Sequence, residues 1–244
     1  MRFGPQRIAA IGQPASMQAL GLPRRSAAAP PAVAPTLTYK GNNTDGTAAT
    51  SYSFAGCDIG TASADRVVVV AAFGNSGGTS IVNGVTIGGI AASPIVTSVA
   101  GTRFLDLWFA VVPTGTTATI AFTTSTNLAR GSVAWWTING STQTTYAARS
   151  GANPNTAGSA TSRSITSITV GAAQVALAVA MNADSTGDDI SWTQSSGSGT
   201  RDFEGAFGTS TRASGYQTNA VGAQVFTPSG GLSAWRAAAF TWGA

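Results

Sequence analysis

The sequence predicts an all-β protein, an antiparallel β-sandwich of jelly-roll-like type with an extended N-terminal arm. Short runs of β-branched and aromatic residues alternate with clusters of turn-forming residues, at the close spacing of sandwiches and barrels. No segment shows a 3.6-residue apolar period with end caps, so helices are not expected. The length of 244 residues allows one large β-domain or two small ones, and either buries a sizeable core.

The expected strands follow one another closely from Thr36 onward. In the first half they are Thr36–Lys40, Ser51–Ala55, Arg66–Phe73, Gly84–Ile87, Phe104–Val112, Ala118–Thr123, Gly131–Ile138 and Tyr146–Arg149. In the second half they are Ser164–Val170, Gln174–Met181, Ile190–Gln194, Arg201–Phe207, Thr211–Tyr216, Ala223–Thr227 and Trp235–Trp242. Between them we expect turns at the residue clusters 42–46, 74–78, 113–115 and 228–231, which supply glycine, proline and asparagine.

The apolar patterns of two stretches indicate buried strands. Val67–Val70 is continuously apolar, as in a central strand that is covered on both faces. Residues 171–183 have a composition compatible with a helix, but their alternation favours a buried strand.

The two halves resemble each other, which suggests a duplicated β-motif. The stretch 65–73 with its glycine-rich continuation parallels 173–181 with 182–187, and 120–125 followed by 136–140 parallels 225–229 followed by 240–243. We therefore expect a body over residues 36–244 with internal halves 36–150 and 151–244.

Residues 1–35 form a predicted anchoring arm. They contain six of the ten prolines and four arginines (Arg2, Arg7, Arg24 and Arg25) but no acidic residue, whereas the remainder has nine basic and nine acidic residues. The run Ala27–Pro35 favours an extended, polyproline-like conformation that does not pack on itself. Two interpretations of the arginines stay open: contact with an acidic surface, either protein or packaged nucleic acid, or a solubilising tail.

The composition excludes several kinds of catalytic and metal site. Histidine is absent, Cys57 is the single cysteine, and only 9% of the residues are charged. A Ser-His-Asp triad, a Cys-His dyad, an imidazole metal ligand, an internal disulfide and a thiolate cluster are therefore all ruled out. We expect no cofactor and no metal, and we interpret Cys57 as a buried, inert thiol.

The acidic residues offer two weak candidate sites. Asp184, Asp188 and Asp189 share one turn but lack the alternating spacing of a calcium loop, so a solvated turn is the better interpretation. Asp202 and Glu204 alternate along an expected strand and should face one side, as a glycosidase pair would. Cross-strand ion pairing with the nearby Arg201 and Arg212 is the simpler explanation.

Among six tryptophans, the adjacent pair Trp135 and Trp136 is the most informative. On a strand the two rings point to opposite faces, so one fills the core while the other meets a second layer, a neighbouring subunit or a ligand. Core or subunit packing is the more frequent explanation; stacking on a sugar ring is the alternative. The segment 83–89 has glycines but neither a following lysine nor a helix, so it is interpreted as a strand between turns.

Several strings resemble β-rich virion-associated proteins of tailed bacteriophages and prophage-like elements. They are residues 64–70, 85–92, 108–116, 130–136 and 237–243. The resemblance spans roughly residues 36–244, excludes the arm and carries no catalytic residues. It implies a non-enzymatic structural component of a phage or phage-like particle, exposed on the head or tail as a decoration, spike or fibre-base protein.

These observations together set the functional expectations. The partners would be other virion proteins and copies of the same chain, held through the arm, and the location would be the virion. Nucleic acid is not an expected partner of the charge-balanced body, and no apolar run approaches the ~20 residues of a membrane helix. A glycan-binding adhesion module for host polysaccharide is the alternative.

Overall fold

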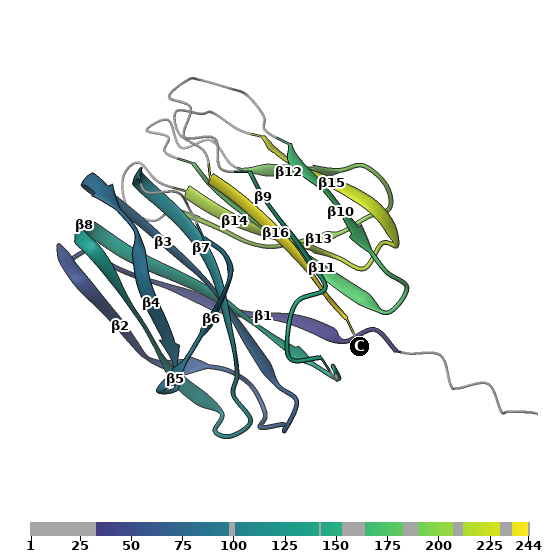
Figure 1. The fold of residues 1–244 in the computed structure, drawn as a ribbon, viewed down its shortest axis with the longest axis horizontal. Coiled ribbons are helices and arrows are strands. Elements are labelled where there is room, and N and C mark those ends of the chain that lie inside the picture. The colour runs from purple at the N-terminus through teal and green to yellow at the C-terminus, as the bar shows by residue number, and fades with distance from the viewer. Residues whose placement is uncertain are drawn as a thin grey trace, which may run out of the picture. The chain divides into compact units, whose positions relative to one another are not determined.

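The computed structural model describes residues 33–97, 101–141, 143–152, 164–182, 190–206, 212–229 and 236–243. Within these ranges all regular secondary structure is β-strand, and the strands pair antiparallel (Figure 1). The first eight are β1 (Thr36–Asp45), β2 (Ala49–Asp58), β3 (Val67–Ser80), β4 (Val82–Ile87), β5 (Ile90–Ala91), β6 (Ser93–Val96), β7 (Gly101–Val111) and β8 (Thr117–Asn139). The others are β9 (Ala148–Ala152), β10 (Ile165–Val170), β11 (Gln174–Asn182), β12 (Ser191–Gln194), β13 (Thr200–Ala206), β14 (Arg212–Thr218), β15 (Gly222–Ser229) and β16 (Arg236–Gly243). The predicted all-β, antiparallel, sandwich-like fold is confirmed.

The first sheet has eight strands and folds over onto itself because β8 is very long. The first part of β8 pairs with β2 and β4, and its last part pairs with β1 and β3. Beyond β3 the sheet continues through β7 to β6. The sequence predicted two strands where β8 is continuous. The residues between them stay extended because Leu128 pairs with both Ala49 and Ser76.

A second difference concerns β3, which continues through the expected turn at residues 74–78 to Ser80. Pairing with β7 and β8 holds this glycine-rich stretch in the sheet, with bulges that take up its irregularity. The turn at 113–115 is where it was expected, with Gly115 at a φ of 74°. β4 ends in a Gly88-Gly89 turn in which both residues have positive φ, so the predicted strand and the turn that follows it are confirmed.

Two glycines lie directly opposite each other where β3 and β8 bend. Gly74 pairs with Gly131, and the aromatic rings of Phe104 and Tyr52 lie against their backbones. A Cβ atom on Gly131 would stand 2.6 Å from the Tyr52 ring, and one on Gly74 would stand 2.3 Å from the Phe104 ring. Both rings are buried, so neither has room to retreat. The glycine pair therefore allows the folded sheet to close over its aromatic core.

We expect Gly131→Ala to lower the free energy of unfolding by about 2 kcal/mol, because overpacking a buried site forces a backbone or side-chain shift. Chemical denaturation measures the change. Gly46→Ala is the matched control, since a Cβ atom there meets nothing within 4 Å, and it should stay within about 0.5 kcal/mol of the wild type. Equal stability of the two variants would contradict this account of the bend.

The strand order of the second half repeats that of the first. A five-stranded sheet runs β13-β14-β11-β16-β9, and a three-stranded sheet runs β10-β15-β12. Strands β9 to β14 take the places of β1, β2, β3, β4, β6 and β7, while β15 and β16 together take the place of β8. The second set begins at β9, a few residues before the expected boundary of 150/151.

The pairing register repeats as well, so the likeness extends to single positions. Trp108 lies opposite Val70 in the first half, and Tyr216 lies opposite Ala178 in the second. Likewise Trp136 lies opposite Val69, and Phe240 lies opposite Leu177. These equivalences agree with the alignment of residues 65–73 with 173–181.

The strands form four stacked layers with three apolar cores between them (Figure 1). The first core fills the folded sheet, the second lies between that sheet and the five-stranded sheet, and the third lies under the three-stranded sheet. On β3, Val68 and Val70 point into the first core, while Val67 and Val69 point into the second. All four side chains are buried, which confirms the predicted central strand. Strand β11 has the same position in the second half, so the strand interpretation of residues 171–183 holds over Gln174–Asn182.

Candidate functional site

The two adjacent tryptophans of β8 are both buried, at 6% exposure for Trp135 and 0% for Trp136. They point to opposite faces as predicted, Trp135 into the first core and Trp136 into the second. The indole of Trp135 donates to the carbonyl of Asp58 over 2.7 Å. The prediction that one of these rings contacts a glycan or a neighbouring subunit is wrong, because both faces of β8 are covered and both rings are buried.

Several predicted residues lie outside the described ranges. They are Arg2, Arg7, Arg24 and Arg25 of the arm, the aspartates 184, 188 and 189, and Trp235. Cys57 is described: its side chain is buried, its thiol donates to the carbonyl of Phe54, and burial raises its thiol pKa. Within the described residues there is no group of three or more acidic or cysteine side chains that would hold a metal ion. The same ranges contain no helix long and apolar enough to span a membrane.

The carboxylates of Asp202 and Glu204 do not face one side, which corrects the predicted alternation. Asp202 accepts a hydrogen bond from the Trp136 indole in the second core, whereas Glu204 accepts one from the backbone amide of Ile190 beside the third core. The reason is a bulge in β13 between Arg201 and Phe203, which breaks the two-residue alternation. Glu204 also pairs with Arg201, but both residues belong to β13, so this ion pair is not the cross-strand pair that was expected.

Asp202 belongs to a polar and aromatic cluster that joins the two halves of the body. Its carboxylate accepts from Trp136 Nε1 over 2.6 Å and from the amide of Gln217. The rings of Tyr39 and Phe203 stack at 5.3 Å, and both lie within 6 Å of the Trp136 ring. Strands β1 and β8 of the first half therefore meet β13 and β14 of the second around one carboxylate.

Burial decides the protonation of this cluster. It raises the pKa of Asp202 to about 6, against the opposing effect of the two hydrogen bonds. It also raises the pKa of the Tyr39 phenol. Asp202 is held by hydrogen bonds from Trp136 and Gln217, and its charge contributes to raising the pKa of Tyr39.

A polar groove of about 510 Å³ lies next to this cluster. Its walls come from the start of β1, from β11 and from the adjoining ends of β13 and β14, and Gln217 connects it to Asp202. The polar lining consists of hydroxyl and amide side chains without a charge: Thr36, Ser198, Thr200, Gln217, Thr218 and Asn219. Pro35 lines the groove too and is buried, so the body includes the last residue of the predicted arm.

A second groove, of about 410 Å³, lies beside β4 at the first core. Trp108 and Phe122 form its apolar floor, and Asn83, Thr86 and Thr123 are exposed at its rim. The lining contains no charged residue. The indole N–H of Trp108 is buried and has no hydrogen-bond partner.

One buried residue that the sequence did not single out is Arg66, at the start of β3. Its side chain has 0% exposure and its guanidinium donates to backbone carbonyls of the two loops that precede β3 and β8. The acceptors are Ile59, Gly60, Thr61, Val112, Thr114 and Gly115, at 2.7 to 3.2 Å. Burial lowers the pKa of Arg66, and the charge of Asp58 acts in the opposite direction. A sequence signal was present, since an arginine directly precedes the continuously apolar run Val67–Val70.

Comparison with models of protein families, with curated proteins and with solved structures finds no match to this chain.

Proposed function

We propose that this protein is a non-enzymatic structural component of a bacteriophage or phage-like particle, exposed on the head or tail and anchored by its N-terminal arm. The observation that carries the proposal is the separation of charge along the chain. Residues 1–35 hold four arginines and no acid, while the rest of the chain has as many acidic as basic residues. A cationic, proline-rich segment of this kind suits docking on an acidic protein surface, because proline reduces the entropy lost on ordering.

The use of the charged groups in the body supports a scaffold. Five described carboxylates, those of Asp45, Asp58, Asp65, Asp202 and Glu204, accept hydrogen bonds from nearby backbone or side-chain groups of the fold. Each of these bonds holds a turn, a loop or a strand in place. Such carboxylates serve the fold, as expected for a rigid particle component.

The two outer layers support the same interpretation. Their exposed faces carry small hydroxyl side chains: Ser51, Ser53, Thr119 and Thr123 on the first layer, and Ser167, Thr169, Ser191 and Thr193 on the last. β2 pairs with β8 and β12 pairs with β15, so these uncharged hydroxyl side chains lie together on the outer face of each layer. Surfaces with little charge suit close packing among subunits, since few ions lose their hydration on contact.

Deleting residues 1–31 tests the anchoring role. The remaining chain keeps Pro35 and β1 and should stay folded by circular dichroism, while its copy number in purified particles should fall at least tenfold. A second variant replaces Arg2, Arg7, Arg24 and Arg25 by glutamine, and Arg201→Gln on the exposed face of β13 is its control. Quantitative mass spectrometry of purified particles measures incorporation. Normal incorporation of the truncated chain would overturn the proposal.

A further inference from the structure

The groove beside β4 contains an unused hydrogen-bond donor. Trp108 is 7% exposed, and its indole N–H has no acceptor. A buried donor without a partner is uncommon and carries a free-energy penalty of about 1 to 3 kcal/mol. The other described indoles are all satisfied: Trp135 by Asp58, Trp136 by Asp202, Trp192 by Ser214 and Trp242 by Ser141. A hydrogen-bond acceptor that enters this groove would give the Trp108 indole N–H the partner that the other described indoles already have.

The second half of the body shows how the fold covers the equivalent position. Tyr216 takes the place of Trp108, and Trp192 from β12 stacks on it at 5.7 Å. Strand β4 is the counterpart of β12, but it offers Gly84 and the exposed Asn83 at the groove. In the second half, the Trp192 ring covers Tyr216. Among the described residues of the first half, no ring covers Trp108 in the same way, and a groove lies beside it.

The backbone beside the groove is also open on one side. β4 pairs with β8 along one edge, but along the other it pairs with β5 only at Thr86 and Ile87. Before Thr86, the edge of β4 that faces away from β8 accepts one backbone hydrogen bond, from the amide of Ala92 to the carbonyl of Val85. An extended segment could therefore lie along β4 at Asn83, above the Trp108 ring.

The chemistry of the groove selects its occupant. A segment that fits must supply a carbonyl acceptor, carry no charge into an uncharged lining and remain extended at low entropic cost. Proline-rich segments meet these conditions, because they present carbonyls, lack amide donors at each proline and are already extended. The stretch Ala27–Ala32 has the sequence AAAPPA and no charge. Val33, the next residue, is 79% exposed.

We propose that the groove beside β4 binds the Ala27–Ala32 stretch of a second copy of the chain, with the Trp108 indole donating to one of its carbonyls. This inference rests on the proposed function, because it assigns a docking groove on a neighbouring subunit to the anchoring arm. Arg24 and Arg25 precede the stretch and would remain outside the uncharged lining, free to contact acidic groups.

The test follows the indole N–H signals of the full-length chain labelled with ¹⁵N-tryptophan. The Trp108 signal, assigned by its loss in Trp108→Phe, should shift as the protein is concentrated and the copies associate. Replacing Pro30 and Pro31 by glycine should abolish this shift. A synthetic peptide of residues 22–34 added to that glycine variant should restore the shift saturably. The Trp192 signal should stay unchanged throughout.

Variants of the groove give an independent readout by sedimentation. Trp108→Phe removes the donor but keeps an aromatic ring, and Thr123→Lys places a charge at the exposed rim without touching the core. Each should weaken self-association at least about tenfold, the equivalent of one lost hydrogen bond. Trp192→Phe in the second half is the matched control and should associate like the wild type. Unchanged thermal unfolding of Thr123→Lys would show that the fold is intact.

The outcomes separate this inference from the proposed function. If the Trp108 indole N–H signal shifts neither with protein concentration nor on addition of the peptide, the inference is wrong. A shift that is independent of concentration but lost in the glycine variant overturns the second copy as the source. If Thr123→Lys and Trp108→Phe enter particles normally while deletion of residues 1–31 does not, the groove assignment falls and the anchoring role stands. If the deletion enters particles normally, the anchoring role itself falls.

Discussion

Replacing Arg66 by methionine should lower the free energy of unfolding by about 4 kcal/mol, in the range seen when a buried charged network is broken. The fully buried guanidinium bonds six carbonyls from two loops. Methionine fills much of the same volume but donates nothing, so the buried carbonyls of Ile59 and Val112 are left without this donor and the more exposed loop carbonyls lose their shared partner. Urea denaturation measures the change.

Two further variants separate the geometry of Arg66 from its charge. Arg66→Lys keeps a positive charge but has three donors on one nitrogen, so it cannot bond both loops at once. We expect it to be less damaging than methionine while remaining well below the wild type. Arg201→Met removes an exposed arginine from an ion pair and should change stability by less than about 1 kcal/mol. A methionine variant of Arg66 as stable as the wild type would show that the two loops do not depend on this side chain.

Replacing Asp202 by asparagine should remove most of the pH dependence of stability between pH 4 and pH 7. Burial among Trp136, Tyr39 and Phe203 raises the pKa of Asp202 to about 6, compared with about 3.9 for an unfolded chain. The folded state therefore holds the proton more tightly. The stability that this provides is fully present below the unfolded pKa and is lost as the pH rises through the folded one.

The size of this effect follows from the difference between the two pKa values. Two units correspond to about 3 kcal/mol, and we expect about 2 kcal/mol because Asp202 is partly exposed. Asparagine can still accept from the Trp136 indole, and Gln217 can turn its amide to pair with the new one. The Asp202→Asn variant should accordingly exceed the wild type at pH 8 and match it near pH 4.

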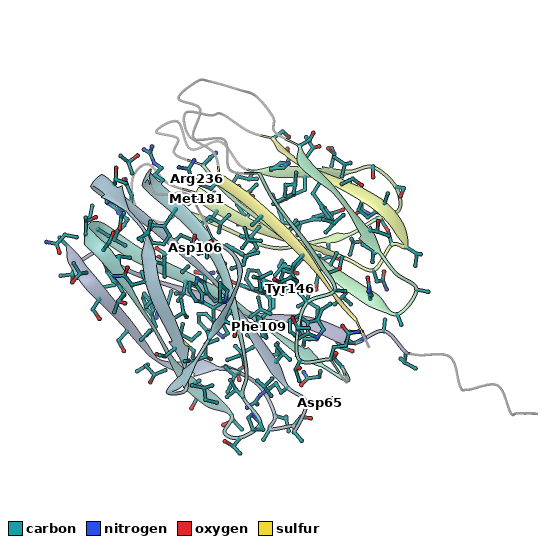
Figure 2. The ribbon with its side chains drawn as sticks, viewed as in Figure 1. Asp65, Asp106, Phe109, Tyr146, Met181 and Arg236 are labelled. Atoms are coloured by element: carbon teal, nitrogen blue, oxygen red, sulfur yellow. The ribbon has the colours of Figure 1, made fainter. Side chains whose placement is uncertain are left out.

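Denaturation at a series of pH values between 4 and 8 provides the measurement. Asp58→Asn is the control, since its side chain is 62% exposed, and it should keep the slope of the wild type because Asp202 is intact. The observation that would sink the idea is a wild-type stability that rises from pH 4 to pH 7. Figure 2 shows side chains filling the spaces between the layers of the body.

Local patterns in the sequence were sufficient for most of the strands. The uninterrupted valines of Val67–Val70 predicted the central strand that the structure places between two cores. Residues 113–115 predicted the turn between β7 and β8, because proline and glycine fix the backbone angles there. The repeated strings predicted an internal repeat, which the strand order and register of the two halves display. Strand β5 has only two residues, too few to show a pattern, and Pro94 interrupts the pattern of β6.

The contacts between distant segments could not be predicted in this way. The number of residues in β8 depends on pairing at Leu128 with strands 50 to 80 residues away, and nothing local marks it. Whether the Trp136 side chain is buried or exposed depended on whether a second sheet covers its face of β8. The separation of Asp202 from Glu204 depended on one bulge, which moves every later side chain to the opposite face.

The amino-acid sequence by itself determined the type of structure, the turn at residues 113–115, the internal repeat and the division between a cationic leading segment and a neutral body. These properties arise from neighbouring residues, whose backbone preferences act over a few positions. Only the tertiary structure decided which faces are covered, that Arg66 holds two loops, and that Trp108 is left with an unused donor beside a groove. Burial and hydrogen bonding depend on groups far apart in the chain, and folding alone brings them together.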